Sequence, residues 1–187
     1  MSATKAALSS FLSRWTDAAV EQLGHFPMIE HDGDWPSDCE LADTLKGNMI
    51  QWKPVERDDS GSFDNIADAL GMTFHPDIVD FYSSFFADNI FAHHSRGHLQ
   101  LLQAWSEDDF ERLQQNLVGH VLMKRNLKQD ETIFIALTDE DDFVITVVNA
   151  TGEVWLEQVG KKPQEKLADS LAEFIAELKP TLESFEL

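Results

Sequence analysis

Three β-rich runs follow one another in the last third of the chain, and they constrain the fold more than any other feature. They cover Thr132 to Leu137, Phe143 to Asn149 and Glu153 to Val159. The acidic stretch Thr138 to Asp142 separates the first two runs, and Ala150-Thr151-Gly152 separates the second from the third. Short polar or glycine-containing connections between such runs are typical of hairpins. The three runs are therefore expected to form an antiparallel meander.

Helical patterns flank this meander on both sides. Apolar residues recur at helical spacing from Leu8 to Leu23, and Gly24 follows where a C-cap glycine would stand. Ser106 with Asp109 three residues later has the pattern of a capping box, which predicts a helix from there to about Leu127. A further helical pattern covers Gln164 to Leu178.

Shorter elements are expected in the middle of the chain. They are a strand over Met49 to Val55, a polar turn over Glu56 to Gly61, a helix over Phe63 to Leu70 closed by Gly71, a helix from Pro76 to Phe86, and two strands, Asn89 to His93 and His98 to Trp105, joined around Gly97. Strands and helices without regular βαβ alternation indicate an α+β fold, with a central, mainly antiparallel sheet of about five to six strands flanked by helices. We expect one domain over residues 1–187, with an N-terminal helix over 1–24 and an irregular acidic loop over 25–48.

The charge of the chain selects its partners. It has 34 acidic and 14 basic residues, a net charge of −20, and between Asp58 and Ser95 seven carboxylates stand without one lysine or arginine. Such a field attracts basic surfaces and repels nucleic acid and anionic lipid. A mean hydropathy of −0.28, with 13 Phe and 5 Trp, is too apolar for a disordered acidic tail. The sequence therefore predicts an ordered binding protein that does not bind nucleic acid.

The compartment is expected to be the cytoplasm. Cys39 is the only cysteine, so the chain cannot close an intramolecular disulfide. Charged residues interrupt the segment Met1 to Leu23, which therefore lacks the apolar core of a signal peptide. No stretch approaches the roughly 20 apolar residues of a membrane span, so we expect no direct insertion into lipid.

The signatures of catalysis and of metal binding are missing from the sequence. It has no glycine-rich phosphate loop, nucleophile elbow or Cys-pair metal motif. His93, His94 and His98 could bind zinc or copper, but strand alternation would send the first two to opposite faces, which favours ordinary hairpin histidines. Asp38 and Glu40 should raise the pKa of Cys39, which favours a structural cysteine. We therefore expect no enzyme, no metal and no cofactor.

Several acidic and aromatic residues are candidates for partner binding. Glu107, Asp108 and Asp109 either cap their helix or contact a partner. The adjacent charges of Asp139 to Asp142 repel one another, so this run is either a solvated turn or part of a binding face. Trp15, Trp105 and Trp155 are expected in the core, whereas Trp35 is either an interface anchor or a plug over the core.

The run Leu101-Leu102-Gln103-Ala104-Trp105-Ser106-Glu107-Asp108-Asp109-Phe110, continued by Gln115-Asn116-Leu117-Val118-Gly119-His120, resembles the Syd family of SecY-interacting bacterial proteins. The likeness extends through Phe81-Tyr82, Thr132 to Leu137, Ser170 to Phe174 and Leu178-Lys179-Pro180, which covers nearly the whole chain. Syd in turn resembles the SUKH superfamily, an α+β fold that includes immunity proteins against bacterial toxins.

The resemblance implies a cytosolic protein, not an enzyme, that docks on basic cytoplasmic loops of the SecY channel and monitors or restrains the Sec translocase. It would associate peripherally with the cytoplasmic side of the inner membrane through this protein partner, and its oligomeric state stays open. The alternative is an immunity protein that neutralises a basic toxin such as a nuclease. The residues expected to bind the partner, chosen by the placement of charge, are Glu56, Asp58, Asp59, Trp105, Glu107, Asp108, Asp109, Glu111, Asp139, Glu140, Asp141 and Asp142.

Overall fold

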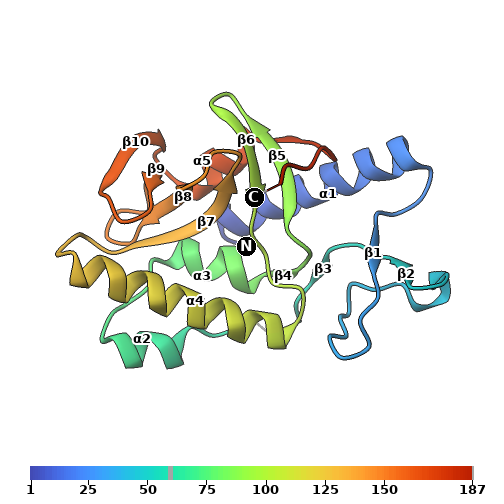
Figure 1. Cartoon of the computed structure of the whole chain (residues 1–187), viewed down its shortest axis with the longest axis horizontal. Coiled ribbons are helices and arrows are strands. Elements are labelled where there is room, and N and C mark those ends of the chain that lie inside the picture. The colour runs from blue at the N-terminus through green and yellow to red at the C-terminus, as the bar shows by residue number, and fades with distance from the viewer. Residues whose placement is uncertain (59–60, 187) are drawn as a thin grey trace.

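A seven-stranded antiparallel sheet forms the centre of the computed structural model, which describes residues 1–58 and 61–186 (Figure 1). Its strand order is β10-β9-β8-β7-β6-β5-β11. The strands are β5 (Ile90–His94), β6 (Gly97–Leu101), β7 (Thr132–Thr138), β8 (Phe143–Val148), β9 (Val154–Gln158), β10 (Pro163–Ala168) and β11 (Lys179–Pro180). Together with its flanking helices, this sheet confirms the predicted α+β class.

The predicted meander is the middle of this sheet. Strands β7, β8 and β9 are hydrogen-bonded neighbours, and the predicted hairpin of β5 and β6 joins them through β6. The cross-strand partners Ala136, Ile145 and Leu156 share one face. Successive residues of a strand point to opposite faces, so Thr146 and its partner Trp155 lie on the other face.

The two outer strands differ from the prediction. The helix expected over Gln164 to Leu178 is wrong in its first part, because Pro163–Ala168 pairs with β9 as β10. Helix α5 (Leu171–Ala176) begins only after Ser170, whose hydroxyl accepts the N–H of Glu173. On the opposite edge, β11 pairs with β5, so the sheet has seven strands rather than the five or six expected. Hydrogen bonds offered by a neighbouring strand outweigh helical periodicity at such places.

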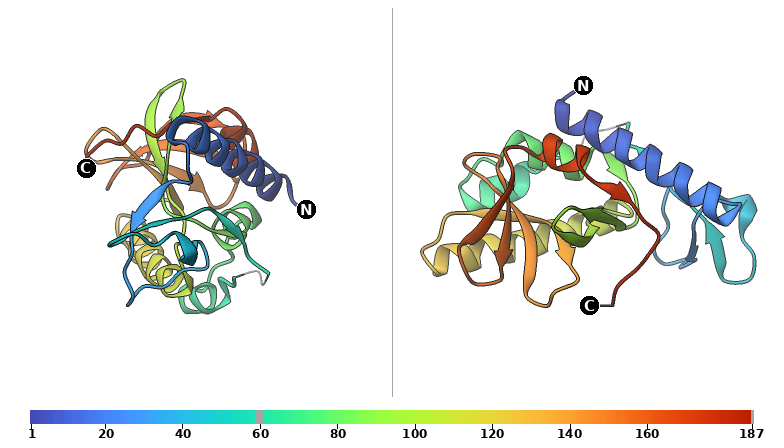
Figure 2. Two further views of the ribbon diagram at one scale, coloured as in Figure 1. Left: turned by 90° about the vertical axis from the view of Figure 1, so that its right-hand side faces the viewer. Right: turned by 90° about the horizontal axis from the view of Figure 1, so that it is seen from above.

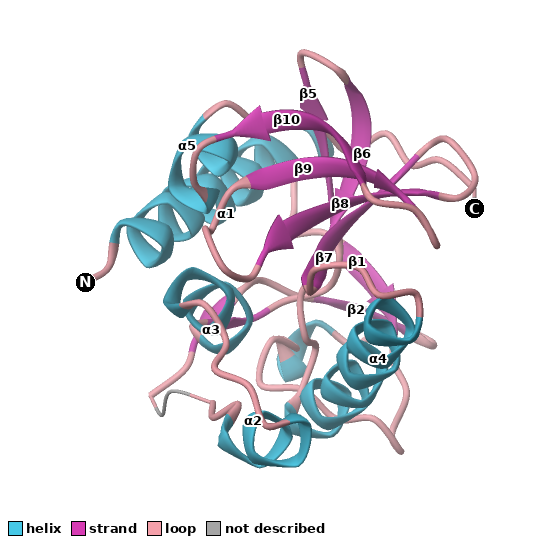
Figure 3. Cartoon of the chain, turned by 90° about the vertical axis from the view of Figure 1, so that its left-hand side faces the viewer, coloured by secondary structure: helices cyan, strands magenta, loops and turns pink. Residues whose placement is uncertain are grey.

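The remaining helices are α1 (Ala3–Leu23), α2 (Asp64–Leu70), α3 (Pro76–Ser83) and α4 (Glu107–Asn126). Helices α1 and α5 cover one face of the sheet, and α4 covers the other (Figure 3). Helix α2 packs against α4, while Tyr82 of α3 donates a hydrogen bond to the carbonyl oxygen of Phe134 in β7 at 2.6 Å. The middle of the sheet thus lies between two helical layers.

Helix ends lie where the capping signals predict them in three cases. Gly24 and Gly71 end α1 and α2 in the left-handed conformation that glycine adopts without strain. The Ser106 hydroxyl accepts the N–H of Asp109 at 3.2 Å and starts α4. The buried stripe of α1 ends at Ala19, earlier than predicted, since Val20 and Leu23 are exposed.

The predicted extension of α3 to Phe86 is wrong. The helix ends at Ser83, and Phe85–Phe86 forms β4, which pairs with β3 (Val55–Glu56). Trp155, expected in the core, is half-buried on the sheet, and its indole N–H bonds Glu153 Oε2 at 3.0 Å. For Phe85–Phe86 the deciding contact is the pairing with β3, which helical spacing does not report.

Residues 25–53 form a small lobe beside the end of α1, away from the main sheet (Figures 1 and 2). The segment predicted as irregular contains β1 (Met28–Glu30) and the 3₁₀ helix η1 (Ala42–Thr44). Strand β1 pairs with β2 (Met49–Gln51), which takes up only part of the strand predicted over Met49 to Val55. The expectation of an entirely irregular loop is therefore wrong, because its first strand finds its partner about twenty residues later in the chain.

A row of three indole rings joins this lobe to the main domain. Trp15 of α1 stacks on Trp52 with ring centres 5.5 Å apart, and Trp52 meets Trp105 edge to face, also at 5.5 Å. Trp15 and Trp52 are buried, whereas Trp105 is half-buried. Aromatic pairs in these geometries add about 0.5–1.5 kcal/mol each beyond their buried area. The row therefore fixes the lobe against the start of α4.

Candidate functional site

The predicted partner-binding residues lie in two separate places. The structure brings Glu56, Trp105, Glu107, Asp108, Asp109 and Glu111 together around the start of α4, close to β3. Asp58 follows Arg57, whose guanidinium meets Glu107, and Asp59 lies outside the described residues. The turn from Asp139 to Asp142 follows β7, beside the β5–β6 hairpin, because Thr138 faces Leu99. The predicted residues thus form two acidic regions of the surface.

Some of these carboxylates already have internal partners. Glu107 Oε2 lies 2.7 Å from Nη2 of the buried Arg57, whose guanidinium also lies over the rings of Phe86 and Phe110. Glu56 Oε1 lies 2.6 Å from Lys5 Nζ. Both carboxylates therefore help to hold β3 and α1 in place, and their charge is partly neutralised within the protein.

A cleft of about 230 Å³ opens between the lobe and the start of α4. We call it the tryptophan cleft, and its lining residues are Ile29, Glu30, Asp32, Trp35, Asp88, Asn89, Trp105, Asp109 and Arg112. Four of these side chains are carboxylates, two are indoles and one is basic. A concave, aromatic and acidic surface of this kind suits a cationic side chain.

Three segments distant in sequence build the tryptophan cleft. The lobe supplies Trp35, the connection between β4 and β5 supplies Asp88, and α4 supplies Asp109. The Ser37 hydroxyl donates to the carbonyl oxygen of Trp105 and accepts the N–H of Cys39 at 3.1 Å, which ties the lobe to the start of α4. These hydrogen bonds fix the lobe side of the cleft against its α4 side.

Asp109 is the central carboxylate of the cleft. Its Oδ2 accepts a hydrogen bond from the backbone N–H of Trp105 at 2.8 Å, and its Oδ1 accepts one from Nη2 of Arg112 at 2.6 Å. The reciprocal hydrogen bond predicted by the capping pattern therefore goes to Trp105 rather than to Ser106. Asp109 both completes the start of α4 and places a negative charge in the cleft.

Asp88 stands in a less hydrated part of the cleft. Burial raises the pKa of its carboxyl, and the nearby charge of Asp109 raises it further, whereas the N–H of Asn89, 2.8 Å from Asp88 Oδ1, lowers it. A carboxylate held in this way gains stability from a cation that enters beside it.

Arg112 is the basic side chain of the cleft. Its Cζ lies 5.5 Å from the centre of the Trp35 ring, and 61% of its side chain is exposed. Trp35, predicted as either an anchor or a plug, is itself 37% exposed and lines the open cleft. This position supports the anchor interpretation.

The second acidic region borders a different cavity, of about 310 Å³. Leu99, Ile145 and Leu156 belong to its apolar lining, and Asp139 and Glu140 line it as well. This cavity lies on the face of the sheet that α5 covers only in part. It adds an apolar surface next to the charges of the turn.

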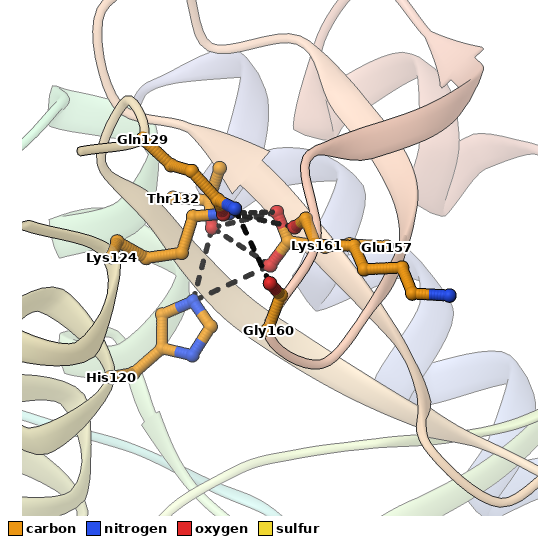
Figure 4. Close-up of polar contacts among 7 residues, drawn as sticks. All are labelled: His120, Lys124, Gln129, Thr132, Glu157, Gly160 and Lys161. Carbon is orange, nitrogen blue, oxygen red and sulfur yellow. Dashed lines mark hydrogen bonds and ion pairs between the residues drawn. The ribbon is translucent and has the colours of Figure 1, made fainter. Parts of the chain in front are cut away.

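Another cluster of charged groups is closed to solvent (Figure 4). Lys124 Nζ and Glu157 Oε1 are 3.1 Å apart, and both side chains are fully buried. Lys124 also donates to Gln129 Oε1 and to the carbonyl oxygen of Lys161, while Glu157 accepts the hydroxyl of Thr132 at 3.0 Å. This network joins α4 to β7 and β9 and serves the fold.

His120 lies beside this network (Figure 4). Its Nε2 is 3.0 Å from the Thr132 hydroxyl and 3.5 Å from Glu157 Oε2. Burial, together with the charge of Lys124, lowers the pKa of His120 to about 4. Burial raises the pKa of Glu157, and the contact with Lys124 lowers it in part. His120 is therefore neutral near pH 7, and Lys124 is the cationic partner of Glu157.

The histidines and the cysteine considered for chemistry have structural surroundings. His94 lies 2.9 Å from Glu177 and packs on Phe174, while His93 and His98 pair across the hairpin with ring centres 4.4 Å apart. Across residues 1–58 and 61–186 no group of three His, Cys, Asp or Glu side chains is arranged to hold a metal ion. The pKa of Cys39 is raised to about 12, mainly by burial, with Asp38 as a minor cause, so the predicted direction is confirmed and the predicted cause corrected.

Glu30, Asp32, Asp88 and Arg112 were not among the predicted binding residues. Their spacing in the chain carries no motif, because the lobe, the β4–β5 connection and α4 meet only in the folded protein. One available signal was the position of Arg112, which stands one helical turn after Asp109.

In the described part of the chain no helix is both long and apolar enough to cross a bilayer.

Comparison with known proteins places the chain among described relatives. A family model described as "Syd protein (SUKH-2)" matches residues 5–180. A "Protein Syd" of Pseudoalteromonas atlantica is 53% identical over 176 residues, which cover 93% of this chain and 94% of the relative. The Colwellia psychrerythraea protein of the same description is 46% identical over 92% of this chain and 90% of its own length. The "Protein Syd" of Alteromonas mediterranea is 44% identical over 92% of this chain and 96% of its own length.

Proposed function

Since the chain belongs to the Syd (SUKH-2) family, we propose that it is a binding protein, rather than an enzyme, that docks on the basic cytoplasmic loops of the SecY channel. By docking there it monitors or restrains the Sec translocase. The association is peripheral, at the cytoplasmic side of the inner membrane, and depends on the protein contact. With a net charge of −20 the protein is repelled by anionic lipid.

The tryptophan cleft is the observation that carries this proposal. Four carboxylates and two indoles line it, against a single arginine. Membrane proteins concentrate lysine and arginine in their cytoplasmic loops, so the cytoplasmic side of a channel offers the complementary charge. An extended basic loop could insert one cationic side chain between the indoles while its neighbours meet the surrounding carboxylates.

Charged and aromatic groups have different parts in this docking. Exposed carboxylates such as Asp108 and Glu111 accelerate encounter and select basic partners, but exposed charges add little lasting affinity. Lasting affinity depends on desolvated anchors, among which tryptophan is prominent. We therefore assign the anchor role to Trp35 and Trp105. The turn from Asp139 to Asp142 supplies a second, weaker contact.

A toxin-neutralising role is less well supported. The matching family model is the Syd model, and the three relatives described above carry the Syd name. A basic toxin would meet the same electrostatics, so charge alone favours neither partner. The family match is the reason to assign SecY.

Capture of SecY by charge-matched variants tests the proposal. The pair Glu30→Lys and Asp32→Lys reverses two charges in the cleft, and Asp139→Lys and Asp141→Lys reverse two in the turn. The control pair, Asp68→Lys and Asp130→Lys, makes the same change at exposed positions near the opposite end of α4. We expect the cleft pair to weaken capture about tenfold or more, the turn pair less, and the control pair least.

An ionic-strength series on the wild type completes this experiment. Capture should weaken steadily with added salt, since charges farther apart than about 8 Å are screened at physiological ionic strength. Equal losses for all three variant pairs would mean that only net charge matters, and would remove the cleft from the docking site. Undiminished capture of SecY by the Glu30→Lys and Asp32→Lys variant would also remove the cleft from the docking site.

A further inference from the structure

Two cavities meet at Arg112. Beside the tryptophan cleft lies a second cavity of about 160 Å³, lined by Asn89, Leu102, Gln103, Asp109, Arg112, Leu113, Asn116 and Phe134. It shares Asn89, Asp109 and Arg112 with the cleft. Arg112 therefore stands at the boundary between the two spaces, beside the first half of α4.

Arg112 is held much less firmly than the buried arginine nearby. Arg57 has 1% of its side chain exposed and lies between the rings of Phe86 and Phe110 while it contacts Glu107. The contacts of Arg112 are with Asp109 and with the exposed ring of Trp35, and 61% of its side chain faces solvent. Solvent competes with such contacts, so Arg112 can leave them at little cost.

Gln103, which also lines the second cavity, contains a buried hydrogen-bond acceptor. Only 4% of this residue is exposed. Its Nε2 donates to the carbonyl oxygens of Phe81 and Leu102 at 3.1 and 2.9 Å, which fixes the orientation of the amide. Its Oε1 is buried and accepts no hydrogen bond from any described residue. Buried amide oxygens nearly always have a donor, so this acceptor, in a residue that lines the second cavity, is unusual.

We propose that the tryptophan cleft is a guanidinium-binding site, which Arg112 occupies in the free protein and from which an arginine of the partner displaces it. The proposal rests on the proposed function, because the partner is taken to be a basic protein segment. It adds that the recognised side chain is arginine and that Arg112 is a built-in competitor. Arg112 itself shows how a guanidinium fits, with its Cζ over the Trp35 ring and its Nη2 donating to Asp109.

The chemistry of the site favours arginine over lysine. A guanidinium offers five N–H donors in one plane and stacks on aromatic rings, whereas an ammonium is compact and strongly hydrated. Asp88 and Asp109 are both acceptors in the cleft. A flat group with several donors can meet both carboxylates while it contacts Trp35.

Calorimetric titration with two capped peptides tests the proposal. Both alternate glycine with three cationic residues, arginine in one and lysine in the other. The proteins are the wild type, Arg112→Gln and the control Lys128→Gln, which removes the same charge at an exposed position just after the far end of α4. We expect the wild type to prefer the arginine peptide. We expect Arg112→Gln to bind it about three- to tenfold more tightly than Lys128→Gln does, because a competing cation–π contact and ion pair are gone.

Each outcome is decisive. Equal affinities of Arg112→Gln and Lys128→Gln for the arginine peptide, or equal binding of the two peptides by the wild type, would overturn the proposal. Thermal unfolding of both variants checks that their fold is intact, and Arg112→Lys provides a second variant that should bind between the wild type and Arg112→Gln. Peptide discrimination without capture of SecY would leave the guanidinium site standing and refute the assigned partner. Capture of SecY without tighter binding of the arginine peptide by Arg112→Gln would support the assigned partner and refute the guanidinium site.

Discussion

The buried pair of Lys124 and Glu157 and the tryptophan cleft place charge in opposite settings. In the first, each charge has a partner of opposite sign and both side chains are fully buried. In the second, four carboxylates and one arginine line a space that is open to solvent. Balanced charges inside the protein hold three elements together, whereas unbalanced charges at its surface remain available to another molecule.

The comparison also explains why the strongly acidic composition leaves the core intact. Burying an unpaired charge is costly, and the buried carboxylate of Glu157 meets Lys124, Thr132 and His120 (Figure 4). The excess negative charge is kept at the surface, at α4 and at the turn from Asp139 to Asp142, where water solvates it. Charge in this protein has a structural use and a recognition use, and Asp109 serves both.

The largest effect is expected from breaking the buried pair. Lys124→Met should lower the free energy of unfolding by about 3–5 kcal/mol, because Glu157 would be left buried without its cation. Urea unfolding at neutral pH measures the change. The control Lys128→Met, at an exposed position just after α4, should change it by less than about 0.5 kcal/mol. A small effect of Lys124→Met, or full recovery by added salt, would show that the pair behaves like a surface pair.

The next effect concerns the protonation of His120. Its pKa in the folded protein is about 4, below the ordinary 6.5, so the unfolded chain binds more protons between these values. The stability contributed by this group is complete above about pH 6.5 and is lost as the pH falls towards 4, by up to about 3 kcal/mol. The raised pKa of Glu157 acts with the opposite sign, because its contribution falls as the pH rises through its folded pKa.

Comparison of two proteins separates these contributions. Urea unfolding between about pH 4 and about pH 7 should show a shallower loss of stability on acidification in His120→Gln than in the wild type. The same slope in both proteins would mean that His120 titrates as it does in the unfolded chain, and the buried network would then be more hydrated than its burial indicates.

In the tryptophan cleft, the largest effect is expected at Trp35. Trp35→Ala should weaken binding of the arginine peptide or of SecY by about 1–2 kcal/mol, since an anchoring indole is lost. Stability should hardly change, because the ring is partly exposed in the free protein. Leu45→Ala, at an exposed apolar residue of the same lobe, is the control. Equal effects of Trp35→Ala and Leu45→Ala on binding would mean that Trp35 covers the core and does not anchor the partner.

The smallest expected effect is a release of protons on binding. Burial raises the pKa of Asp88, and a cation bound beside it should lower that pKa again. Binding should therefore release less than about one proton per complex at mildly acidic pH. Titration calorimetry in buffers of different ionisation enthalpy measures the number. Asp88→Asn should remove the release, and an unchanged proton count in that variant would exclude Asp88 from the site.

Local signals predicted the parts of the fold that depend on neighbouring residues. Ser106, Gly24 and Gly71 mark helix ends correctly because each acts through its own backbone conformation or its own short hydrogen bond. Strand β10 was missed because Leu167 continues the apolar spacing of α5, while the partner that makes it a strand, β9, lies in another segment. Long-range pairing has no local signature of this kind.

The candidate site was predictable only in part, for the same reason. The acidic start of α4 was identified from Glu107, Asp108 and Asp109, whose charges are adjacent in the sequence. The cleft itself was not, because Trp35, Asp88 and Arg112 come from segments with no shared pattern. Tertiary packing brings them together, and it also reveals which carboxylates, such as Glu107, already have a cation of their own.

The edges of the main sheet have a consequence for the behaviour of the protein at high concentration. Strand β10 begins with Pro163 and has two register shifts, and the opposite edge strand, β11, ends with Pro180. Proline offers no N–H to an incoming strand, and an irregular edge presents a poor template for one. The sheet is therefore protected at both ends against edge-to-edge aggregation, and fibrous assembly through added strands is disfavoured.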